Sequence, residues 1–285
     1  MSIYAAHVRE EVSRHAAEYA QNNSTTFRRS HESFCSGVFV PETDALRHGN
    51  FHPASYRAIM RRPVWRVRFR KALTVPDRLR RSDDQHRICE LDSCCSSDAL
   101  LMNVFCHPIA RRSSLVANLL GISEPAVPIF GWRARIPLEG NKFDRTEVDM
   151  KFGSLLVEAK LTEPSFESCP LPQMKAYEDF ETVFRRGELH RTRRQYHGYQ
   201  LLRNVLAAHH HRASFCLLTD ARRKDLIDAW YEVLRAIRPI DLRVRCKLLT
   251  WQELAEALPK SLRRFLALKY GIERGVAASH SAVGY

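Results

Sequence analysis

The sequence predicts an α/β fold in which a mixed β-sheet is flanked by helices. Short runs that alternate apolar and polar residues suit strands, whereas other runs have the three- and four-residue spacing of amphipathic helices. The predicted order is helices, three strands, helices, strand, helix, strand and helix, which suits one sheet covered on both faces. With 285 residues, of which 45% are hydrophobic, the chain can bury one good core and carry an extension.

We divide the chain into a basic N-terminal extension of residues 1–95, a core of residues 96–274 and a disordered tail of residues 275–285. The extension is expected to begin with a helix over residues 1–20, in which apolar residues such as Val12 and Ala16 have helical spacing. The tail is small and polar, which is typical of a disordered terminus.

The segment from Arg61 to Arg81 is the most basic of the chain, with nine Lys or Arg residues and a single acid. Apolar and cationic residues alternate within it, in the order Trp65, Arg66, Val67, Arg68, Phe69 and Arg70. This alternation predicts a strand with one apolar and one cationic face. The three arginines are candidates for phosphate contacts, each of which would add to the salt dependence of nucleic-acid binding. An ordinary solvated strand face is the other interpretation.

The core is expected to begin with two helices and a strand. Ser96 or Ser97 can cap the first helix, and the second, over residues 113–120, should end at Gly121. A strand over residues 129–136 follows and leads towards a β-hairpin.

That hairpin is expected to turn at Gly153 and Ser154, because glycine accepts the positive φ of a two-residue loop. The second strand, residues 154–161, alternates as a half-buried strand does, so that Glu158 and Lys160 point the same way. A turn centred there sets Asp149 opposite Glu158 and Glu147 opposite Lys160. Directly opposed residues have Cβ atoms about 4.5–5.5 Å apart.

Two carboxylates at that separation raise each other's pKa unless a cation lies between them. Mg²⁺, which takes one or two carboxylates together with water and phosphate oxygens, suits Asp149 and Glu158. Lys160 could then orient or deprotonate an attacking water, or hold a phosphate oxygen as negative charge builds up. A surface hairpin with ordinary polar residues is the alternative, but the apolar residues around Glu158 and Lys160 argue against it, since burying charges is costly without a partner.

The stretches Glu147-Val148-Asp149 and Val157-Glu158-Ala159-Lys160-Leu161 resemble the core motif of the PD-(D/E)xK nucleases, the restriction-endonuclease-like superfamily. Val148 stands where the motif usually has proline. Residues 96–272 more specifically resemble a group of bacterial proteins classed as restriction endonucleases, on the basis of three further stretches: 96–105, 158–163 and 199–204. The resemblance implies a restriction-endonuclease-like fold, Mg²⁺ with Mn²⁺ as a substitute, and the Ala159 carbonyl as a third metal ligand.

Two helices, over residues 171–184 and 192–211, are expected after the hairpin. On the second, Gln195, Tyr199 and Arg203 are each four residues apart and would share one face. Gln195 and Tyr199 resemble the accessory motif of RecB-type nucleases, whereas Gln200 to Asn204 fits the restriction-endonuclease group, and we favour Gln200 as the accessory glutamine. A polar helix face without a catalytic role is the other interpretation.

The rest of the core should alternate strands and helices. Strands are expected over residues 214–219 and 244–249. Asp220 can cap the helix that follows the first, and Thr250 with Glu253 forms a capping box for the last helical region, which Pro259 interrupts.

The charge of the chain points to a polyanionic partner. The formal net charge is +13 and the pI is near 9.6, so a nucleic acid, DNA in the first place, is the expected partner. A homodimer is left open. The sequence has no apolar run long enough to span a membrane and no signal-peptide pattern at its start, so we expect a cytoplasmic protein.

The cysteines are expected to be free thiols. Five residues form a cluster: Cys89, Cys94, Cys95, Cys106 and His107. Their spacing lacks the paired C-x-x-C of a structural zinc site.

Taken together, these features predict a metal-dependent DNA nuclease with Asp149, Glu158 and Lys160 at its centre. An upstream acid often completes such sites, and Asp98 and Glu124 are candidates. Two alternatives remain: a DNA-binding protein with a degenerate nuclease fold, and a metal-sensing module built on the cysteine cluster.

Overall fold

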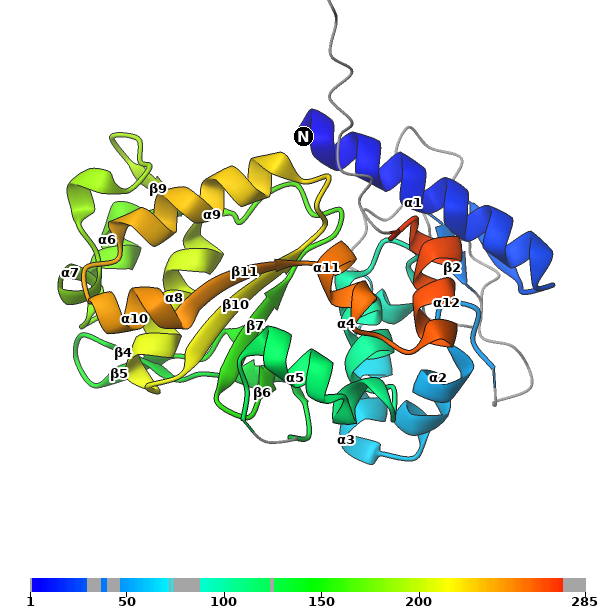
Figure 1. Cartoon of the computed structure of the whole chain (residues 1–285). Coiled ribbons are helices and arrows are strands. Elements are labelled where there is room, and N and C mark those ends of the chain that lie inside the picture. The colour runs from blue at the N-terminus through cyan, green and yellow to red at the C-terminus, as the bar shows by residue number, and fades with distance from the viewer. Residues whose placement is uncertain are drawn as a thin grey trace, which may run out of the picture.

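A five-stranded mixed sheet forms the centre of the computed structural model, which describes residues 2–29, 37–39, 47–71, 73, 88–123 and 126–273. Its strands are β3 (Ile129–Arg133), β6 (Glu147–Phe152), β7 (Leu155–Ala159), β10 (Ser214–Thr219) and β11 (Cys246–Thr250). They lie in the order β11-β10-β7-β6-β3 (Figure 1). β6 pairs antiparallel with β7 and β3, whereas β10 runs parallel to β7 and β11. The predicted mixed α/β sheet is therefore confirmed.

Helices cover both faces of this sheet (Figure 1). One apolar cluster includes residues of α1 (Ile3–Asn22), α4 (Ser97–Phe105), α5 (Ser114–Leu120), α11 (Trp251–Glu256) and α12 (Lys260–Tyr270). The other includes residues of α6 (Leu171–Lys175), α7 (Phe180–Val183), α8 (Tyr199–His210), α9 (Lys224–Ala236) and α10 (Ile240–Arg245). Because side chains alternate along β7, Leu155 and Val157 belong to the first cluster and Leu156 to the second.

A third, smaller cluster lies beside α4. It is built from α2 (Pro53–Met60) and α3 (Pro63–Arg66), and the 3₁₀ turns η1 (Val67–Arg70) and η3 (Glu90–Asp92) lie next to it. Trp65 is buried there, and its indole N–H donates to the Pro128 carbonyl at 3.0 Å. The N-terminal residues thus pack on the rest of the molecule in two places, since α1 also packs along α12.

Three pairs of short strands and two further 3₁₀ turns complete the described structure. The pairs are β1 (Phe27–Arg29) with β2 (Gly37–Phe39), β4 (Ile136–Leu138) with β5 (Lys142–Asp144), and β8 (Ser168–Pro170) with β9 (Gln195–His197); the turns are η4 (Ala110–Arg112) and η5 (Arg186–Glu188). None of the described helices combines the length and the hydropathy that crossing a bilayer requires.

Several predicted helix ends are confirmed by their caps. The Ser96 hydroxyl accepts from Ala99 N at 3.1 Å at the start of α4. α5 ends at Gly121, which adopts the left-handed conformation (φ 62°). Thr250 and Glu253 form the expected capping box of α11. These positions were predictable because a cap depends on one or two local side chains.

The predicted strand at residues 65–70 is wrong, because this segment is helical in α3 and η1. Pro63 occupies the first helical position, where proline is favoured. Arg66 and Arg70 are exposed, but the Arg68 side chain is only 11% exposed and turns inward to two carboxylates. The expected cationic face with three equivalent arginines therefore does not exist.

The helix predicted over residues 192–211 is too long. α8 starts at Tyr199, and Gln195 lies in β9, which pairs with β8. Gly198 separates the two elements with a φ of 73°, a conformation that does not continue a helix. The helix predicted over residues 171–184 is likewise interrupted between α6 and α7.

Three smaller predictions also need correction. The strand expected over residues 129–136 breaks before Arg135, which has a φ of 52°. Residues 244 and 245 end α10 instead of beginning β11. Asp220 does not cap α9, because its carboxylate binds the Arg222 guanidinium. The tail from residue 274, Cys35 and Glu124 lie outside the described residues.

Candidate active site

The β6–β7 hairpin has the predicted register. Met150 pairs with Val157 and Phe152 with Leu155, and Gly153 in the turn has a φ of 61°. The paired ladder stops at Met150, so Asp149 is not paired with Glu158 across it. Instead, Asp149 Oδ2 accepts a hydrogen bond from the Ala159 amide at 2.8 Å. This contact fixes the carboxylate of one strand against the backbone of the other, at the end of the hairpin.

Glu158 and Lys160 point the same way, as the alternation predicted, but they are far more buried than a half-buried strand implies. Glu158 is 2% exposed and Lys160 is 5% exposed, because β7 is the third of five strands and has helices on both sides. Lys160 Nζ lies 2.8 Å from Glu158 Oε1. The Asn204 amide donates to Glu158 Oε2 at 2.7 Å. Both oxygens of Glu158 are thus held from the protein side.

The pKa values of Asp149 and Lys160 depend on burial and on the charges around them. Burial raises the pKa of Asp149 well above its usual range, and the negative charges of Glu158 and Asp98 raise it further. Burial alone would lower the pKa of Lys160, but the carboxylates of Glu158, Glu163 and Asp149 outweigh this effect and raise it. Lys160 is therefore an ammonium ion at neutral pH and cannot act as a base in this state.

The backbone of Lys160 is anchored on both sides. Its amide donates to the Leu218 carbonyl of β10 at 2.9 Å, and its carbonyl accepts from the Trp251 indole N–H at 2.9 Å. Trp251 is completely buried at the start of α11. These contacts hold Lys160 at the carboxyl end of β7 although the strand itself ends at Ala159.

A second group of charged residues faces the hairpin from α4 and η1. Arg68 places one guanidinium nitrogen 2.6 Å from Asp98 Oδ2 and the other 3.0 Å from Glu147 Oε2. Lys71 Nζ lies 2.8 Å from Glu90 and 3.4 Å from Asp98. Of the two upstream acids considered, Asp98 therefore lies at the site. Glu147 contacts Arg68 and not Lys160.

Helix α8 contributes the residues of its first turns. Arg203 is 4% exposed and donates to the Glu147 carbonyl at 2.9 Å, while Tyr199 lies beside it with its ring centroid 5.8 Å from the guanidinium carbon. Gln200 lines the same cavity, and its Oε1 is buried without a hydrogen-bond partner among the described residues. Gln195 is exposed in β9, so the predicted shared face of Gln195, Tyr199 and Arg203 is wrong.

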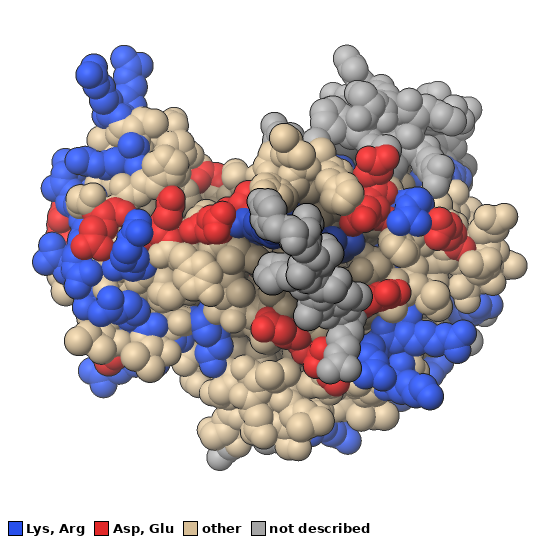
Figure 2. All heavy atoms as spheres, turned by 45° about the horizontal axis from the view of Figure 1, so that its top comes forward, with Lys and Arg blue, Asp and Glu red and all other residues tan. Residues whose placement is uncertain are grey.

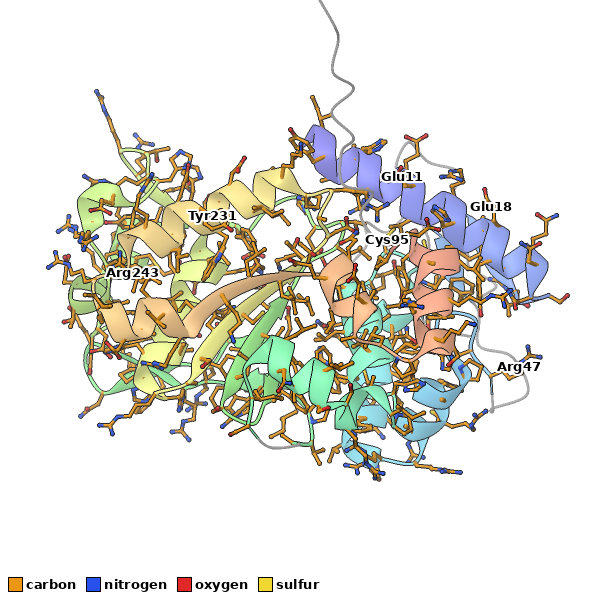
Figure 3. The ribbon with its side chains drawn as sticks, viewed as in Figure 1. Glu11, Glu18, Arg47, Cys95, Tyr231 and Arg243 are labelled. Carbon is orange, nitrogen blue, oxygen red and sulfur yellow. The ribbon has the colours of Figure 1, made fainter. Side chains whose placement is uncertain are left out.

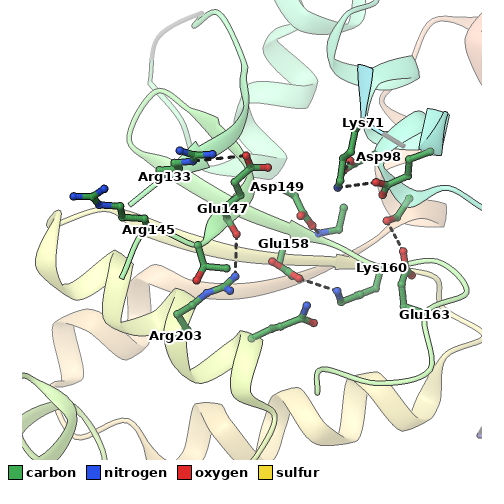
Figure 4. Close-up of a pocket in the computed structure, with 15 residues that line it drawn as sticks. Lys71, Asp98, Arg133, Arg145, Glu147, Asp149, Glu158, Lys160, Glu163 and Arg203 are labelled. Carbon is green, nitrogen blue, oxygen red and sulfur yellow. Dashed lines mark hydrogen bonds and ion pairs between the residues drawn. The ribbon is translucent and has the colours of Figure 1, made fainter. Parts of the chain in front are cut away.

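These groups surround one cavity of about 480 Å³ (Figure 4). Acidic and amide groups line it together with the arginines at its margin: Lys71, Glu90, Ser97, Asp98, Arg133, Arg145, Thr146, Glu147, Asp149, Glu158, Ala159, Lys160, Glu163, Gln200 and Arg203. Arg133 and Arg145 are exposed beside Glu147. The cavity can thus offer carboxylates to a cation and guanidinium groups to an anion.

Some members of this site were missed from the sequence. The family stretch of residues 199–204 contains Asn204 but does not indicate its contact with Glu158, and no motif indicates the contact of Trp251 with the Lys160 carbonyl. Glu163, which accepts from the Ser97 hydroxyl at 2.5 Å and from the Leu161 amide at 2.7 Å, was also missed. The contacts of Asn204 with Glu158, of Trp251 with Lys160 and of Glu163 with Ser97 join separate elements, so no spacing rule predicts them.

The cysteine cluster is divided between two places. The sulfur atoms of Cys94 and Cys95 are 3.7 Å apart beneath α1, where Figure 3 labels Cys95. His107 instead lies against His52, with ring centroids 5.0 Å apart and the rings tilted by 58°, and burial lowers the pKa of His107 to about 4. Across the described residues, no three His, Cys, Asp or Glu side chains come together as a metal-binding group. The alternative of a metal-sensing module stays a prediction, which zinc and iron analysis of the purified protein would test.

The donors at the hairpin nevertheless fit Mg²⁺. This ion commonly takes one or two carboxylates from a protein and completes its shell with water, carbonyl and phosphate oxygens. Asp149 and Glu158 are two such carboxylates. Burial first, and then the charges of Glu158 and Asp98, raise the pKa of Asp149, and a cation beside it would favour its charged form. The fit rests on this donor set and on the cavity in front of it.

A mixed sheet that presents Asp149 on one strand and Glu158-x-Lys160 on the next defines a restriction-endonuclease-like fold. The chain belongs to the family described as restriction endonuclease associating with ARP, whose model matches residues 13–271. No curated protein and no solved structure matches the chain. Membership indicates a nuclease that interacts with DNA, and it confirms the resemblance drawn from the two motif stretches.

Proposed function

We propose that this protein is a metal-dependent nuclease that hydrolyses phosphodiester bonds in DNA, as a restriction or defence endonuclease. The observation that carries the proposal is the arrangement of Asp149, Glu158 and Lys160 at the wall of a cavity with arginines at its margin. Such a cavity suits a substrate whose charge is negative and whose reaction gains negative charge in the transition state.

In the proposed reaction, a water oxygen attacks phosphorus, the bond to one sugar oxygen breaks, and that oxygen leaves with a proton. Asp149, Glu158 and the Ala159 carbonyl would hold Mg²⁺ or Mn²⁺, which would supply Lewis-acid chemistry for the attack of water on the phosphate. The Lys160 ammonium, held by Glu158 at 2.8 Å, positions the water or stabilises the charge on the phosphate oxygens.

The residues of α8 support this centre. Asn204 orients Glu158 by donating to Oε2, and Arg203 holds the β6 backbone at the Glu147 carbonyl. Gln200 lines the cavity, which suits a contact of its side chain to water or to the substrate. Arg133 and Arg145 would bind the neighbouring phosphates.

The first experiment incubates the full chain with plasmid, linear duplex and single-stranded DNA and with RNA, with and without Mg²⁺ or Mn²⁺. We expect DNA cleavage that EDTA abolishes. Asp149→Ala and Lys160→Ala should each lower the cleavage rate by at least about 100-fold, as loss of one charge-stabilising group typically does. Both variants should bind DNA within a few-fold of the wild type when measured by fluorescence anisotropy.

Lys224→Ala removes an exposed lysine at the start of α9 and serves as the matched control that keeps cleavage. Cleavage that persists in purified Asp149→Ala protein would refute the site assignment. Salt-sensitive DNA binding with no cleavage under any metal condition would favour the alternative of a binding protein with a degenerate nuclease fold.

A further inference from the structure

Arg68 occupies an unusual position between two acids of the cavity. Its two terminal nitrogens reach Asp98 on α4 at 2.6 Å and Glu147 on β6 at 3.0 Å, and its side chain is only 11% exposed. A planar guanidinium holds two carboxylates in the fixed geometry of its fork, whereas a lysine ammonium is a rotatable point charge. Desolvation opposes the charge on Arg68, but the attraction of the two acids outweighs it, so the pKa of Arg68 is raised.

The surrounding structure is shaped to receive this side chain. Trp65 anchors the segment by its buried indole, three residues before Arg68. Gly131 on β3 has a φ of 61°, and a Cβ at that position would overlap both the Arg68 guanidinium and the Glu147 carboxylate. The sheet therefore has a glycine where the Arg68 guanidinium and the Glu147 carboxylate meet over the backbone of β3.

The acids that Arg68 binds belong to the same cavity as Asp149 and Glu158. Three cations face three acids on this side: Arg68 and Lys71 contact Asp98, Lys71 contacts Glu90, and Arg133 lies 3.9 Å from Glu147. At the hairpin, by contrast, Lys160 is the one cation that the described residues place against Asp149 and Glu158. The unbalanced negative charge is therefore located at the hairpin and not around Arg68.

Nucleases with two metal ions place them about 3.5–4 Å apart and use acids on both sides of the reacting phosphate. We infer that Arg68 is a built-in cation that takes the place of a second divalent ion between Asp98 and Glu147, so that this site binds one divalent metal ion. The inference rests on the proposed function, because it concerns the metal requirement of that same site. Arg68 is a positioning residue that neutralises Asp98 and Glu147 without exchanging with solvent ions.

The test counts Mn²⁺ ions bound to the full chain without DNA, by electron paramagnetic resonance and by calorimetry. The wild type should bind one ion. Arg68→Met keeps much of the side-chain volume but frees Asp98 and Glu147, and it should bind two. Arg66→Met removes an exposed arginine two residues away and should still bind one. In cleavage assays, the Hill coefficient for Mg²⁺ should rise from about 1 towards 2 in Arg68→Met only.

A second measurement keeps the inference testable if Arg68→Met does not fold. Glu147→Gln in the otherwise wild-type chain should still bind one Mn²⁺, within about fivefold of the wild-type affinity, because Arg68 and not the metal holds this acid. Asp149→Asn should lose the ion. Loss of Mn²⁺ in Glu147→Gln would make Glu147 a ligand and overturn the inference.

Two ions in the wild type, or one ion in a folded Arg68→Met protein, would also overturn it. A wild type that binds no Mn²⁺ would remove the metal site and the inference together. One ion in the wild type and two in Arg68→Met, without cleavage of any nucleic acid, would refute the proposed function and leave the inference on Arg68 standing.

Discussion

Asp149 is expected to destabilise the folded protein when no metal ion is bound. Its carboxylate is desolvated, lies near two other acids and receives one hydrogen bond from the Ala159 amide. Because its pKa is raised above that of an unfolded chain, the native state holds more protons than the unfolded state between the two pKa values. Without metal, folding stability should therefore fall as pH rises through this window, and a divalent cation should restore it.

The Asp149→Asn variant tests whether the negative charge of Asp149 destabilises the metal-free protein. The variant removes the negative charge but keeps an oxygen that can accept from Ala159, so the metal-free protein should be more stable than the wild type at pH 7.5. We expect a gain of about 0.5–2 kcal/mol, the size common for relieving a functional strain. Thermal unfolding with EDTA and with Mg²⁺ measures it, and Mg²⁺ should stabilise only the wild type.

Asp228→Asn, at an exposed position of α9, is the control and should stay within about 0.5 kcal/mol of the wild type. A metal-free Asp149→Asn protein that unfolds at lower temperature than the wild type would contradict the prediction.

At the residue scale, the sequence predicted what depends on neighbours along the chain. The Gly153 turn and the period of two gave the register of the hairpin and the common direction of Glu158 and Lys160. The sequence could not place Asn204 against Glu158 or Arg68 against Asp98 and Glu147. Those contacts depend on how separate elements pack, which no local pattern encodes.

At the scale of elements, α1 and α12 enclose a buried lysine. Lys269 is 0% exposed, its ammonium lies 3.4 Å from the centroid of the Tyr270 ring, and its Nζ donates to the Cys94 carbonyl at 3.3 Å. No ion pair with a carboxylate holds it among the described residues. Burial lowers the pKa of Lys269 to about 7, although negative charge on the sulfur atoms of Cys94 and Cys95 raises it.

Lys269→Met should stabilise the protein by about 1–3 kcal/mol at pH 7, the usual cost of burying a poorly compensated polar group. An unfolded lysine has a pKa near 10.4, so between pH 7 and 10 the unfolded wild type binds the additional proton and wild-type stability rises with pH. The advantage of the variant should shrink across this range. Guanidinium chloride unfolding at pH 7, 8, 9 and 10 measures the difference.

Lys260→Met, at the exposed start of α12, should show no such pH dependence. If Lys269→Met were less stable than the wild type at pH 7, the buried amine would have to be a net stabilising group.

Elements were predictable where local signals agreed with the packing. Caps and breaks fixed α4, α5 and α11, whereas the alternating segment 65–70 folds as helix. The alternation in this segment does not reflect a strand. Trp65 and Arg68 are oriented by contacts with residues elsewhere in the chain, Pro128 and Asp98. Gln195 does not belong to α8, because it lies in β9, which pairs with β8 before the helix starts.

At the scale of the whole molecule, the net charge of +13 is not spread evenly. Figure 2 shows Lys and Arg side chains gathered at two margins of one face, with acidic side chains nearer its middle. A duplex could contact such basic margins through its phosphates. The family match spans residues 13–271 and so includes most of the N-terminal segment that supplies the exposed Arg66 and Arg70.

If Arg66 and Arg70 contact DNA phosphates, each contributes about 0.9 to the slope of log K against log salt concentration. The double variant Arg66→Ala/Arg70→Ala should therefore reduce that slope by about 1.8 and weaken binding similarly for all sequences. Anisotropy titrations between 50 and 300 mM salt, in EDTA to prevent cleavage, measure the slope at about six concentrations.

Arg14→Ala is the control, because α1 lies at the top of Figure 1 and α3 at the bottom, and it should leave the slope unchanged. An unchanged slope in the double variant would assign these two arginines to an ordinary solvated surface, and the phosphate contacts would then have to come from the cavity margin at Arg133 and Arg145.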